Sequence, residues 1–322
     1  MKPYSEYLQR INTAIEQANY GQYPDELYAP IRYMMSLGGK RLRPILTLMA
    51  CDLFGSDSEK AVPAALAVEV FHNFTLVHDD IMDNAPLRRG KETVYKKWNM
   101  PVAILAGDLM MIKATDFLCE TDTPRLKELI TLFNTTAREV CEGQQIDMNF
   151  ETQNQVKHEE YIHMITLKTA VLLGAALKLG ALVAGASDSD AEHIYEFGKN
   201  TGIAFQIQDD ILDSFGDGSL TGKKVGGDIA ANKKTLLLIE LLESVHKDDK
   251  KVLDELLKMP DSDEKIQGVL ALYTKYQIRE FAELKKQTYF NLALKNLSKI
   301  QAKPESKQVL ESMAINLMER LS

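Results

Sequence analysis

Apolar residues recur at intervals of three and four along most of this 322-residue chain, and this spacing restricts the fold more than any other sequence feature. Side chains three and four positions apart share one face of an α-helix, whereas β-strands alternate apolar and polar positions. No series of short alternating segments occurs, and there are only 18 glycines and 10 prolines. We therefore expect an all-α fold. Because no linker or low-complexity tract interrupts the pattern, residues 1–322 are predicted to form a single domain.

The net charge of the chain indicates which kinds of molecule it is expected to bind. Lys and Arg total 38 against 46 Asp and Glu, which gives a net charge of -8. This acidic balance argues against nucleic-acid binding, for which a basic surface is typical. An acidic protein that binds anions must gather its positive charge locally or recruit metal ions, and the motifs of this chain suggest both.

Cysteine usage and hydropathy predict the location of the protein. Cys51, Cys119 and Cys141 are scattered without CxxC spacing, as is typical of reduced thiols in the cytoplasm. The N-terminal segment MKPYSEYLQRINTAIEQ is too polar for a signal peptide. The apolar stretch Thr169–Ala186 is almost long enough to span a membrane, but Lys178 lies at its centre and glycines interrupt it. We expect a buried core helix, no transmembrane segment and a cytoplasmic protein.

Two aspartate clusters follow apolar helical runs: LVHDDIMD (76–83) and IQDDILD (207–213) share the pattern D-D-I-x-D. The first and last carboxylates of each pattern share a helix face, where like charges repel each other and oppose the helix dipole. A sequence that repeats such an unfavourable arrangement indicates a bound cation. Oxygen ligands favour a hard ion, magnesium, shared between carboxylates and substrate phosphates. The predicted metal ligands are Asp79, Asp80, Asp83, Asp209, Asp210 and Asp213.

Basic residues are concentrated around these clusters. The segment GGKRLRP (38–44) places three cations beside two glycines, which let backbone approach an anion closely. His72 lies two helical turns before the first cluster on the same helix face, and Arg88 and Arg89 follow that cluster. Further lysines lie in TLKTA (166–170) and TGKKVGGDIAANKKT (221–235). Together these residues predict a site for two polyanionic substrates.

Taken together, the motifs resemble those of trans-type polyprenyl diphosphate synthases, over all but roughly the last fifth of the chain. The shared segments are GGKRLRP, FHNFTLVHDDIMDNAPLRRG, AGD (106–108), EGQQIDM (142–148), LKTA, FQIQDDILD and TGKKVGGDIAANKKT. One departure is the segment KKTLLL, where many relatives have a proline shortly after the threonine. The resemblance implies the isoprenoid-synthase fold, a bundle of about ten or more helices around a deep central cavity.

The resemblance also implies roles at the matching positions. Isopentenyl diphosphate would be bound by Lys40, Arg43, His72 and Arg89. The allylic diphosphate would face Arg88, Lys168, Thr169, Gln206, Lys223 and Lys233. The principal ligands of two or three magnesium ions would be Asp79, Asp83 and Asp209. The residues closest to the chemistry would be Asp79, Asp83, Arg88, Lys168, Asp209 and Lys223.

The implied reaction is the head-to-tail condensation of isopentenyl diphosphate with an allylic prenyl diphosphate. Two alternatives stay open at this point. A class I terpene cyclase shares the helical cavity and one aspartate motif, but its second cluster normally differs and it needs no GGKRLRP site. A non-catalytic partner subunit of a synthase typically lacks aspartates or the Lys-Arg site, all of which are present here.

Product length is implied by the residues just before the first aspartate cluster. In the family, the residues four and five positions before it commonly form the floor of the tail cavity. Here these are Thr75 and Phe74, with Phe71 as a second candidate. A bulky ring at the fifth position resembles short-chain synthases, so we expect a C15 or C20 product, with C20 favoured because residue 75 is small. The resemblance also implies a homodimer.

Overall fold

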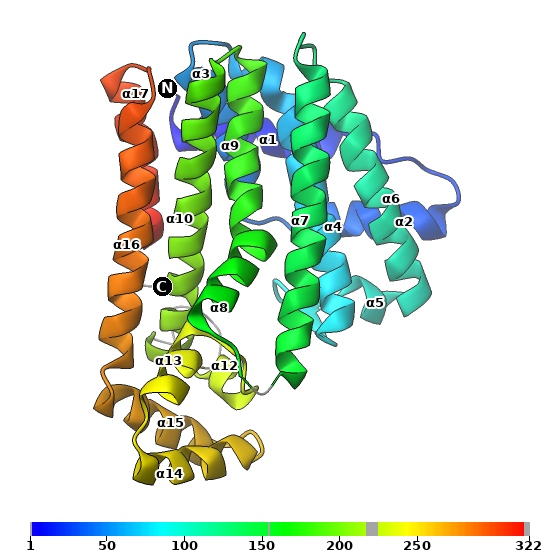
Figure 1. Cartoon of the computed structure of the whole chain (residues 1–322). Helices are drawn as coiled ribbons and strands as arrows, with labels where there is room; N and C mark the ends of the chain where they lie inside the picture. The colour runs from blue at the N-terminus through cyan, green and yellow to red at the C-terminus, as the bar shows by residue number, and fades with distance from the viewer. Residues whose placement is uncertain (1, 154, 217–224, 319–322) are drawn as a thin grey trace. The chain divides into compact units, whose positions relative to one another are not determined.

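Helices form almost all of the regular structure in the computed structural model, which describes residues 2–153, 155–216 and 225–318 (Figure 1). The elements up to residue 119 are, in chain order, α1 (Tyr4–Gln17), α2 (Asp25–Ser36), α3 (Leu42–Leu53), the 3₁₀ helix η1 (Ser58–Ala61), α4 (Val62–Met82), β1 (Leu87–Arg88), β2 (Lys91–Glu92), α5 (Val94–Lys97) and α6 (Met100–Cys119). The two strands form one short antiparallel hairpin. The prediction of an all-α fold is confirmed.

The remaining described elements are again helical. They are α7 (Leu126–Thr152), α8 (His158–Ile165), the π-helical turn η2 (Thr166–Ala170), α9 (Val171–Val183), α10 (Asp188–Phe215), α12 (Gly227–Ala230), α13 (Leu236–Ser244), α14 (Lys247–Lys258), α15 (Asp263–Lys275), α16 (Ile278–Lys299) and α17 (Pro304–Met318). Several begin where the sequence supplies a side-chain cap. Ser262, for example, accepts a hydrogen bond from the backbone N–H of Lys265 at the start of α15.

Contacts between Cα atoms divide the chain into two compact units. The first unit consists of the described residues within 1–134, 175–195 and 300–306. The second unit consists of those within 135–174, 196–299 and 307–322. The single domain over residues 1–322 stays a prediction.

Helix α4 is central to the first unit, where it packs against α1, α3 and, most extensively, α6. It begins with Pro63 in its first turn, where the missing N–H of proline removes no helical hydrogen bond. It ends at Met82, with Asp83 as its C-cap, and the next residue, Asn84, has a φ of 50°. Gly107 of α6 lies close to His78 of α4, since a Cβ at position 107 would lie 2.3 Å from Nε2 of His78. The first aspartate cluster therefore lies at the C-terminal end of a packed helix, as predicted.

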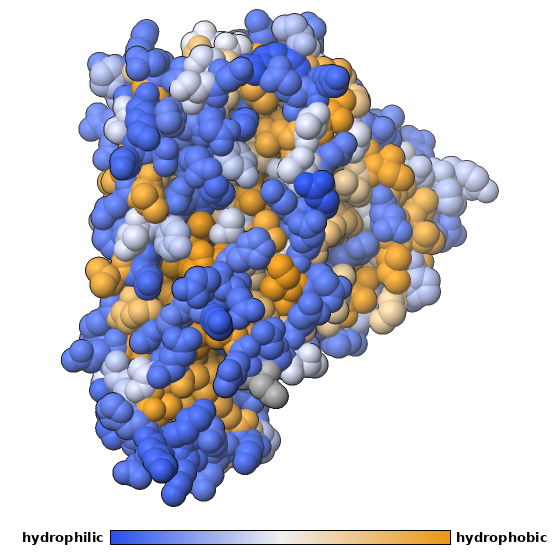
Figure 2. All heavy atoms as spheres, viewed as in Figure 1, coloured by the Kyte–Doolittle hydropathy of each residue, from blue (hydrophilic) through white to orange (hydrophobic). Residues whose placement is uncertain are grey.

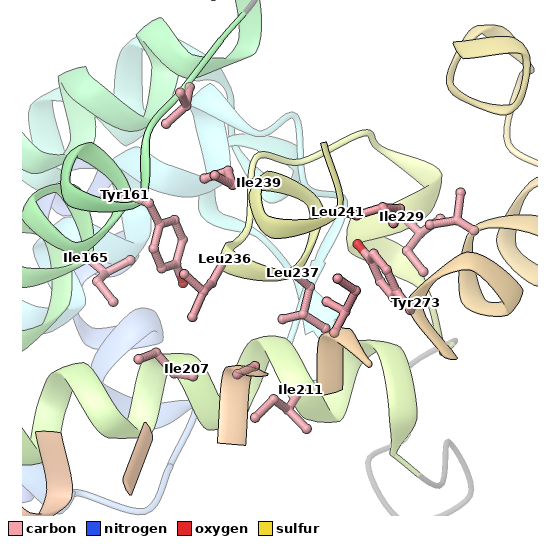
Figure 3. Packing of buried hydrophobic residues seen from close by; sticks show 14 of the residues in the cluster. Tyr161, Ile165, Ile207, Ile211, Ile229, Leu236, Leu237, Ile239, Leu241 and Tyr273 are labelled. Carbon is pink, nitrogen blue, oxygen red and sulfur yellow. The ribbon is translucent and has the colours of Figure 1, made fainter. Parts of the chain in front are cut away.

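The second unit has its own hydrophobic core, shown in Figure 3. Side chains from several helices meet there, and those labelled in the figure are Tyr161 and Ile165 of α8, Ile207 and Ile211 of α10, Ile229 of α12, Leu236, Leu237, Ile239 and Leu241 of α13, and Tyr273 of α15. The second aspartate cluster lies in the last turns of α10, so its predicted place near a helix end is confirmed. This core fixes the helix that carries the cluster.

One continuous helical stretch, His158–Val183, is long and apolar enough to cross a membrane by length and composition alone. Within the described chain, 72% of its most apolar window is buried. Buried core helices of soluble proteins pass the same test, and the burial agrees with the predicted core helix.

Candidate active site

The three carboxylates of the first aspartate cluster have different environments. Asp80 is 1% exposed, whereas Asp79 is partly exposed and Asp83 is exposed. Nε of Arg88 donates to both carboxylate oxygens of Asp80 at 2.9 Å, and Nη2 of Arg88 lies 2.8 Å from Oδ1. Burial raises the pKa of Asp80, and the hydrogen bonds and charge of Arg88 oppose that rise. The middle carboxylate is thus held by an arginine, and the outer two lie toward solvent.

The hairpin directs its two arginines to different partners. Arg89 and Gly90 form its turn with φ values of 52° and 74°, as the two central residues of a type I′ turn require. While Arg88 binds Asp80, Nη1 of Arg89 donates to the carbonyl of Gly38. A Cβ at Gly39 would lie 3.0 Å from Cζ of Arg89. Gly39 of GGKRLRP therefore makes room for Arg89.

The three cations of GGKRLRP also have different partners. Arg41 is 5% exposed and donates to the Glu69 carboxylate and to the carbonyl of Met35, so it anchors the loop. Arg43 lies against His72, with 3.3 Å between Nη1 and Nε2. Lys40 is exposed, and its carbonyl accepts a hydrogen bond from the Tyr4 hydroxyl at 2.7 Å.

Positive charge is concentrated around His72. Burial lowers its pKa well below the usual 6.5, and Arg43, Arg89 and Arg88 lower it further. Burial also lowers the pKa of Arg43 to about 10. Such a concentration of positive charge around a neutral imidazole favours an anionic ligand.

The second aspartate cluster also has one buried middle carboxylate and two outer carboxylates that are more exposed, but its hydrogen-bond partners differ. Asp210 is 4% exposed, Asp209 is exposed and Asp213 is partly exposed. The Tyr161 hydroxyl and the Gln206 side-chain amide donate to the carboxylate of Asp210. Burial raises the pKa of Asp210 to about 7, and these hydrogen bonds limit the rise. Figure 3 shows Tyr161 reaching from α8 toward α10.

The predicted basic and polar residues of the second unit lie beside acceptors. Nζ of Lys168 is 2.5 Å from Oδ2 of Asp147, and Oγ1 of Thr169 donates to Oε1 of Gln206 at 3.4 Å. Nζ of Lys233 is 3.9 Å from a carboxylate oxygen of Asp228. Asp228 in turn donates its backbone N–H to Asp213 at 2.9 Å. Lys223, also predicted for this site, lies outside the described residues.

Two of the three predicted chain-length residues, Phe71 and Phe74, lie in a row of aromatic contacts in the first unit. Phe71 is 1% exposed, and Phe74 and Thr75 are partly buried. The ring of Phe74 lies 5.5 Å from that of Phe71 and 4.9 Å from that of His78. On its other side Phe71 contacts Phe133 of α7 at 5.3 Å. Phe74 is therefore the less buried ring of the Phe71–Phe74 pair.

Residues 24–274 match the model of the family described as Polyprenyl synthetase. The chain belongs to the polyprenyl synthetase family. The geranylgeranyl diphosphate synthase of Sulfolobus acidocaldarius is 39% identical over 307 residues, which cover 94% of this chain and 92% of that protein. That of Saccharolobus solfataricus is 42% identical over 83% of this chain and 82% of its own. A crystal structure of a geranylgeranyl pyrophosphate synthase matches with a TM-score of 0.95 and 42% identity over all of both chains.

Membership of the polyprenyl synthetase family confirms several predictions. The fold is the all-α isoprenoid-synthase fold, and the protein is a transferase, a short-chain trans-prenyltransferase by its relatives. Isoprenoid diphosphates are the class of substrate, and members of the family use a divalent metal. The roles of individual residues stay predictions.

The carboxylates present fit a divalent metal of this kind. Asp79 with Asp83, and Asp209 with Asp213, each pair two oxygen-donor side chains one helical turn apart. In the described part of the chain, no three His, Cys, Asp or Glu side chains gather as a self-sufficient metal site. Magnesium usually takes only one or two carboxylates and completes its shell with water and substrate phosphates. Each pair therefore supplies the number of carboxylates that such an ion usually takes.

Sequence reasoning missed the residues that hold the site residues in place. Glu69, Asp147 and Tyr161 contact Arg41, Lys168 and Asp210 respectively. Two of them carried a signal. Glu69 is a lone acid in the apolar run AALAVEVF, which indicates a buried partner, and Asp147 belongs to EGQQIDM. Nothing in the sequence around Tyr161 indicates its role, because its partner, Asp210, lies 49 residues away.

Proposed function

We propose that the protein condenses isopentenyl diphosphate head to tail with an allylic prenyl diphosphate and releases diphosphate. The observation that supports this most is a repeated arrangement. In each unit a helix ends in two outward aspartates and one buried aspartate, and basic side chains lie nearby. Two metal-binding carboxylate pairs suit the two phosphates of one leaving group, and the cations around His72 suit a second diphosphate.

The chemistry begins with the allylic substrate. Its C1–O bond breaks, and the electron pair leaves with the diphosphate. Asp79 and Asp83 of the first unit and Asp209 of the second, supported by Asp80, Asp210 and Asp213, would hold divalent metal ions, which would supply positive charge to that leaving group. Arg88, Lys168, Lys223 and Lys233 stabilise the same developing charge more than the intact substrate, and Thr169 and Gln206 help to orient it.

The second substrate completes the reaction. Lys40, Arg43, His72 and Arg89 bind the diphosphate of isopentenyl diphosphate, and the low pKa of His72 keeps its imidazole neutral while the guanidinium groups carry the charge. The double bond attacks the allylic cation and forms the new carbon–carbon bond. A C–H electron pair then restores a double bond, and we assign the departing proton to the released diphosphate.

One incubation tests this function against its alternatives. The purified chain receives isopentenyl diphosphate, one of several allylic diphosphates and magnesium, and the products are separated by chain length. We expect longer prenyl diphosphates and stoichiometric diphosphate release. A cyclase would instead release hydrocarbon from the allylic substrate alone, and a regulatory partner subunit would be inactive by itself. Either result would refute the proposal.

We further propose that the metal is magnesium, with two or three ions in each active site. The oxygen-only donor sets support a hard ion, and hard ions prefer carboxylate, phosphate and water to the softer ligands that zinc favours. Exhaustive chelation should abolish turnover and added magnesium should restore it. Full restoration by zinc but not by magnesium would contradict the proposal.

The proposed product is C15 or C20, with C20 favoured. Support comes from the Phe74 ring five residues before Asp79, and from relatives that are named geranylgeranyl diphosphate synthases. The incubation above reads product length directly, and a main product of C30 or longer would contradict the short-chain assignment.

We also propose a homodimer. Helix α6 carries large apolar side chains at the surface, and Figure 2 shows apolar residues on the side of the molecule where α6 lies. They are Met100, Ile104, Leu105 and Ile112, with Leu105 59% and Ile112 57% exposed. Burying such a face against a second copy removes apolar surface from water. A monomer in sedimentation across micromolar concentrations would refute the dimer. The cytoplasmic location stays a prediction.

A further inference from the structure

The turn that carries Lys168 and Thr169 has an unusual backbone. Residues Thr166–Ala170 form a π-helical turn between α8 and α9. Isolated π-turns are rare and frequently lie at functional sites, because they shift the side chains that follow out of the regular helical register. Both predicted ligands of the allylic diphosphate in this segment lie inside the π-turn.

Two glycines from two other helices contact the backbone of this turn. A Cβ at Gly143 of α7 would lie 2.3 Å from the backbone N of Lys168 and 2.7 Å from its Cα. A Cβ at Gly202 of α10 would lie 2.7 Å from Cα of Ala170. Real Cβ atoms essentially never approach below 3.0 Å, and backbone atoms cannot rotate away as a side chain can. Only glycine fits at either position.

Each of these helices makes a second contact with the turn one helical turn later. Asp147 lies four residues after Gly143 and accepts from the Lys168 ammonium at 2.5 Å. Gln206 lies four residues after Gly202 and accepts from the Thr169 hydroxyl at 3.4 Å. Residues i and i+4 share a helix face. On both helices, therefore, the glycine packs against the backbone of the π-turn, and the polar side chain four residues later accepts a hydrogen bond from a side chain of that turn.

We propose that Gly143 and Gly202 are positioning residues for Lys168 and Thr169, and that Asp147 completes the positioning of Lys168. This inference rests on the proposed function, in which both side chains bind the allylic diphosphate. An added methyl group at Gly143 must displace the Lys168 backbone by about 1 Å to reach an ordinary contact, and a misplacement of this size can cost about 10²-fold in rate.

The experiment compares Gly143→Ala and Gly202→Ala with Gly268→Ala. Gly268 is the matched control: it is also a helical glycine of the second unit, but a Cβ there meets only the flexible tip of Leu256, at 2.6 Å. We expect kcat/KM for the allylic substrate to fall about 10²-fold in the first two variants, with little change in KM for isopentenyl diphosphate. Gly268→Ala should resemble the wild type. Circular dichroism and Tm monitor folding.

A double-mutant cycle separates positioning from general damage. In a Lys168→Ala background, adding Gly143→Ala should cost less than about threefold, because residues that act through one another are not additive. A full additional 10²-fold loss would overturn the proposal, and so would an equal loss for both substrates. Calorimetry with an unreactive allylic thiolodiphosphate, a readout that needs no turnover, should show the same loss of affinity.

A further variant keeps the test informative if either alanine variant does not fold. Asp147→Asn preserves the shape of a partly exposed side chain and removes its charge, and it should weaken the same allylic binding about tenfold. Unchanged binding would overturn the role of Asp147. Failure of the wild-type incubation would refute the proposed function itself, whereas failure of these variants to discriminate would refute only the positioning role.

Discussion

The two aspartate clusters are alike in sequence but differ in what holds the middle carboxylate. Asp80 and Asp210 are 1% and 4% exposed, so burial raises the pKa of both. Asp80 is met by the guanidinium of Arg88, which offsets the burial with opposite charge. Asp210 is met by the neutral donors of Tyr161 and Gln206, and its pKa rises to about 7. The two clusters share the pattern D-D-I-x-D, and the side chain that binds the middle carboxylate determines how far the pKa of that carboxylate rises.

Some of the predicted substrate-binding cations of the two units also differ in their partners. Arg43 and Arg89 of the first unit hydrogen-bond to neutral groups, the imidazole of His72 and the carbonyl of Gly38. Lys168 and Lys233 of the second unit lie beside carboxylates. Arg41 and Arg88 of the first unit bind the carboxylates of Glu69 and Asp80, so the contrast holds only for Arg43 and Arg89, the two arginines proposed to bind isopentenyl diphosphate.

The largest expected effect tests whether the outer aspartates of the two clusters are equivalent. Removing one transition-state donor typically costs about 10²–10³-fold, and losing a metal ligand at the leaving group should cost at least that. Asp79→Ala and Asp209→Ala should therefore each lower kcat by three or more orders of magnitude (~10³) at saturating magnesium, measured in steady state. If either variant keeps more than a tenth of wild-type activity, that residue is not a principal metal ligand.

The next effect tests whether the adjacent arginines serve different substrates. Because Arg88 binds Asp80 and Arg89 contacts the GGKRLRP loop, the two truncations should separate kinetically. Arg89→Ala should mainly raise KM for isopentenyl diphosphate, and Arg88→Ala that for the allylic substrate, each by about 10–10²-fold, the effect of losing a charged hydrogen bond of roughly 1.5–3 kcal/mol. Equal shifts in both constants would show that the arginines share one ligand.

A smaller effect tests the neutral partner of Asp210. Tyr161→Phe removes one hydrogen bond to a buried carboxylate, which should lower the free energy of unfolding by about 1.5–3 kcal/mol and also reduce turnover. Tyr7→Phe is the matched control, since the Tyr7 hydroxyl donates to Asp52 at 2.6 Å in the first unit, away from the aspartate clusters. It should lose comparable stability in denaturant unfolding but keep its activity. Equal losses of activity in both variants would mean that Tyr161 acts only on stability.

The smallest effect on rate concerns product length, which we assign to the first unit alone. Phe74→Ala should lengthen the products by opening space beneath the first cluster, while kcat changes little. Phe117→Ala is the control: it truncates a ring buried in the same unit that contacts Tyr20, and it should leave product length unchanged. An active Phe74→Ala enzyme with an unaltered product distribution would show that Phe74 is not the floor.

The sequence predicted those parts of the site that depend on short-range spacing. Helical periodicity placed both aspartate clusters near the ends of helices, and α4 and α10 end there. It also placed Arg88 and Arg89 just beyond the first helix, but did not indicate that a type I′ hairpin would turn them to different partners. The motif set, rather than periodicity, indicated the family and the reaction.

Other features depend on contacts between distant residues. The sequence shows Lys168 and Thr169 beside each other, yet the π-turn that presents them requires close approach by Gly143 and Gly202 from two other helices. Likewise, nothing near Asp210 in the sequence indicates that Tyr161 will donate to it from 49 residues away.

By itself, then, the sequence determined the helices, the repeated aspartate pattern and the chemistry of its side chains, since each follows from residues within a few turns of one another. The tertiary structure alone decided which carboxylate of each cluster is buried and which donor holds it. Burial and hydrogen bonding are properties of the packed neighbourhood, and they set the pKa of Asp80 and of Asp210 through an arginine in one unit and a tyrosine in the other.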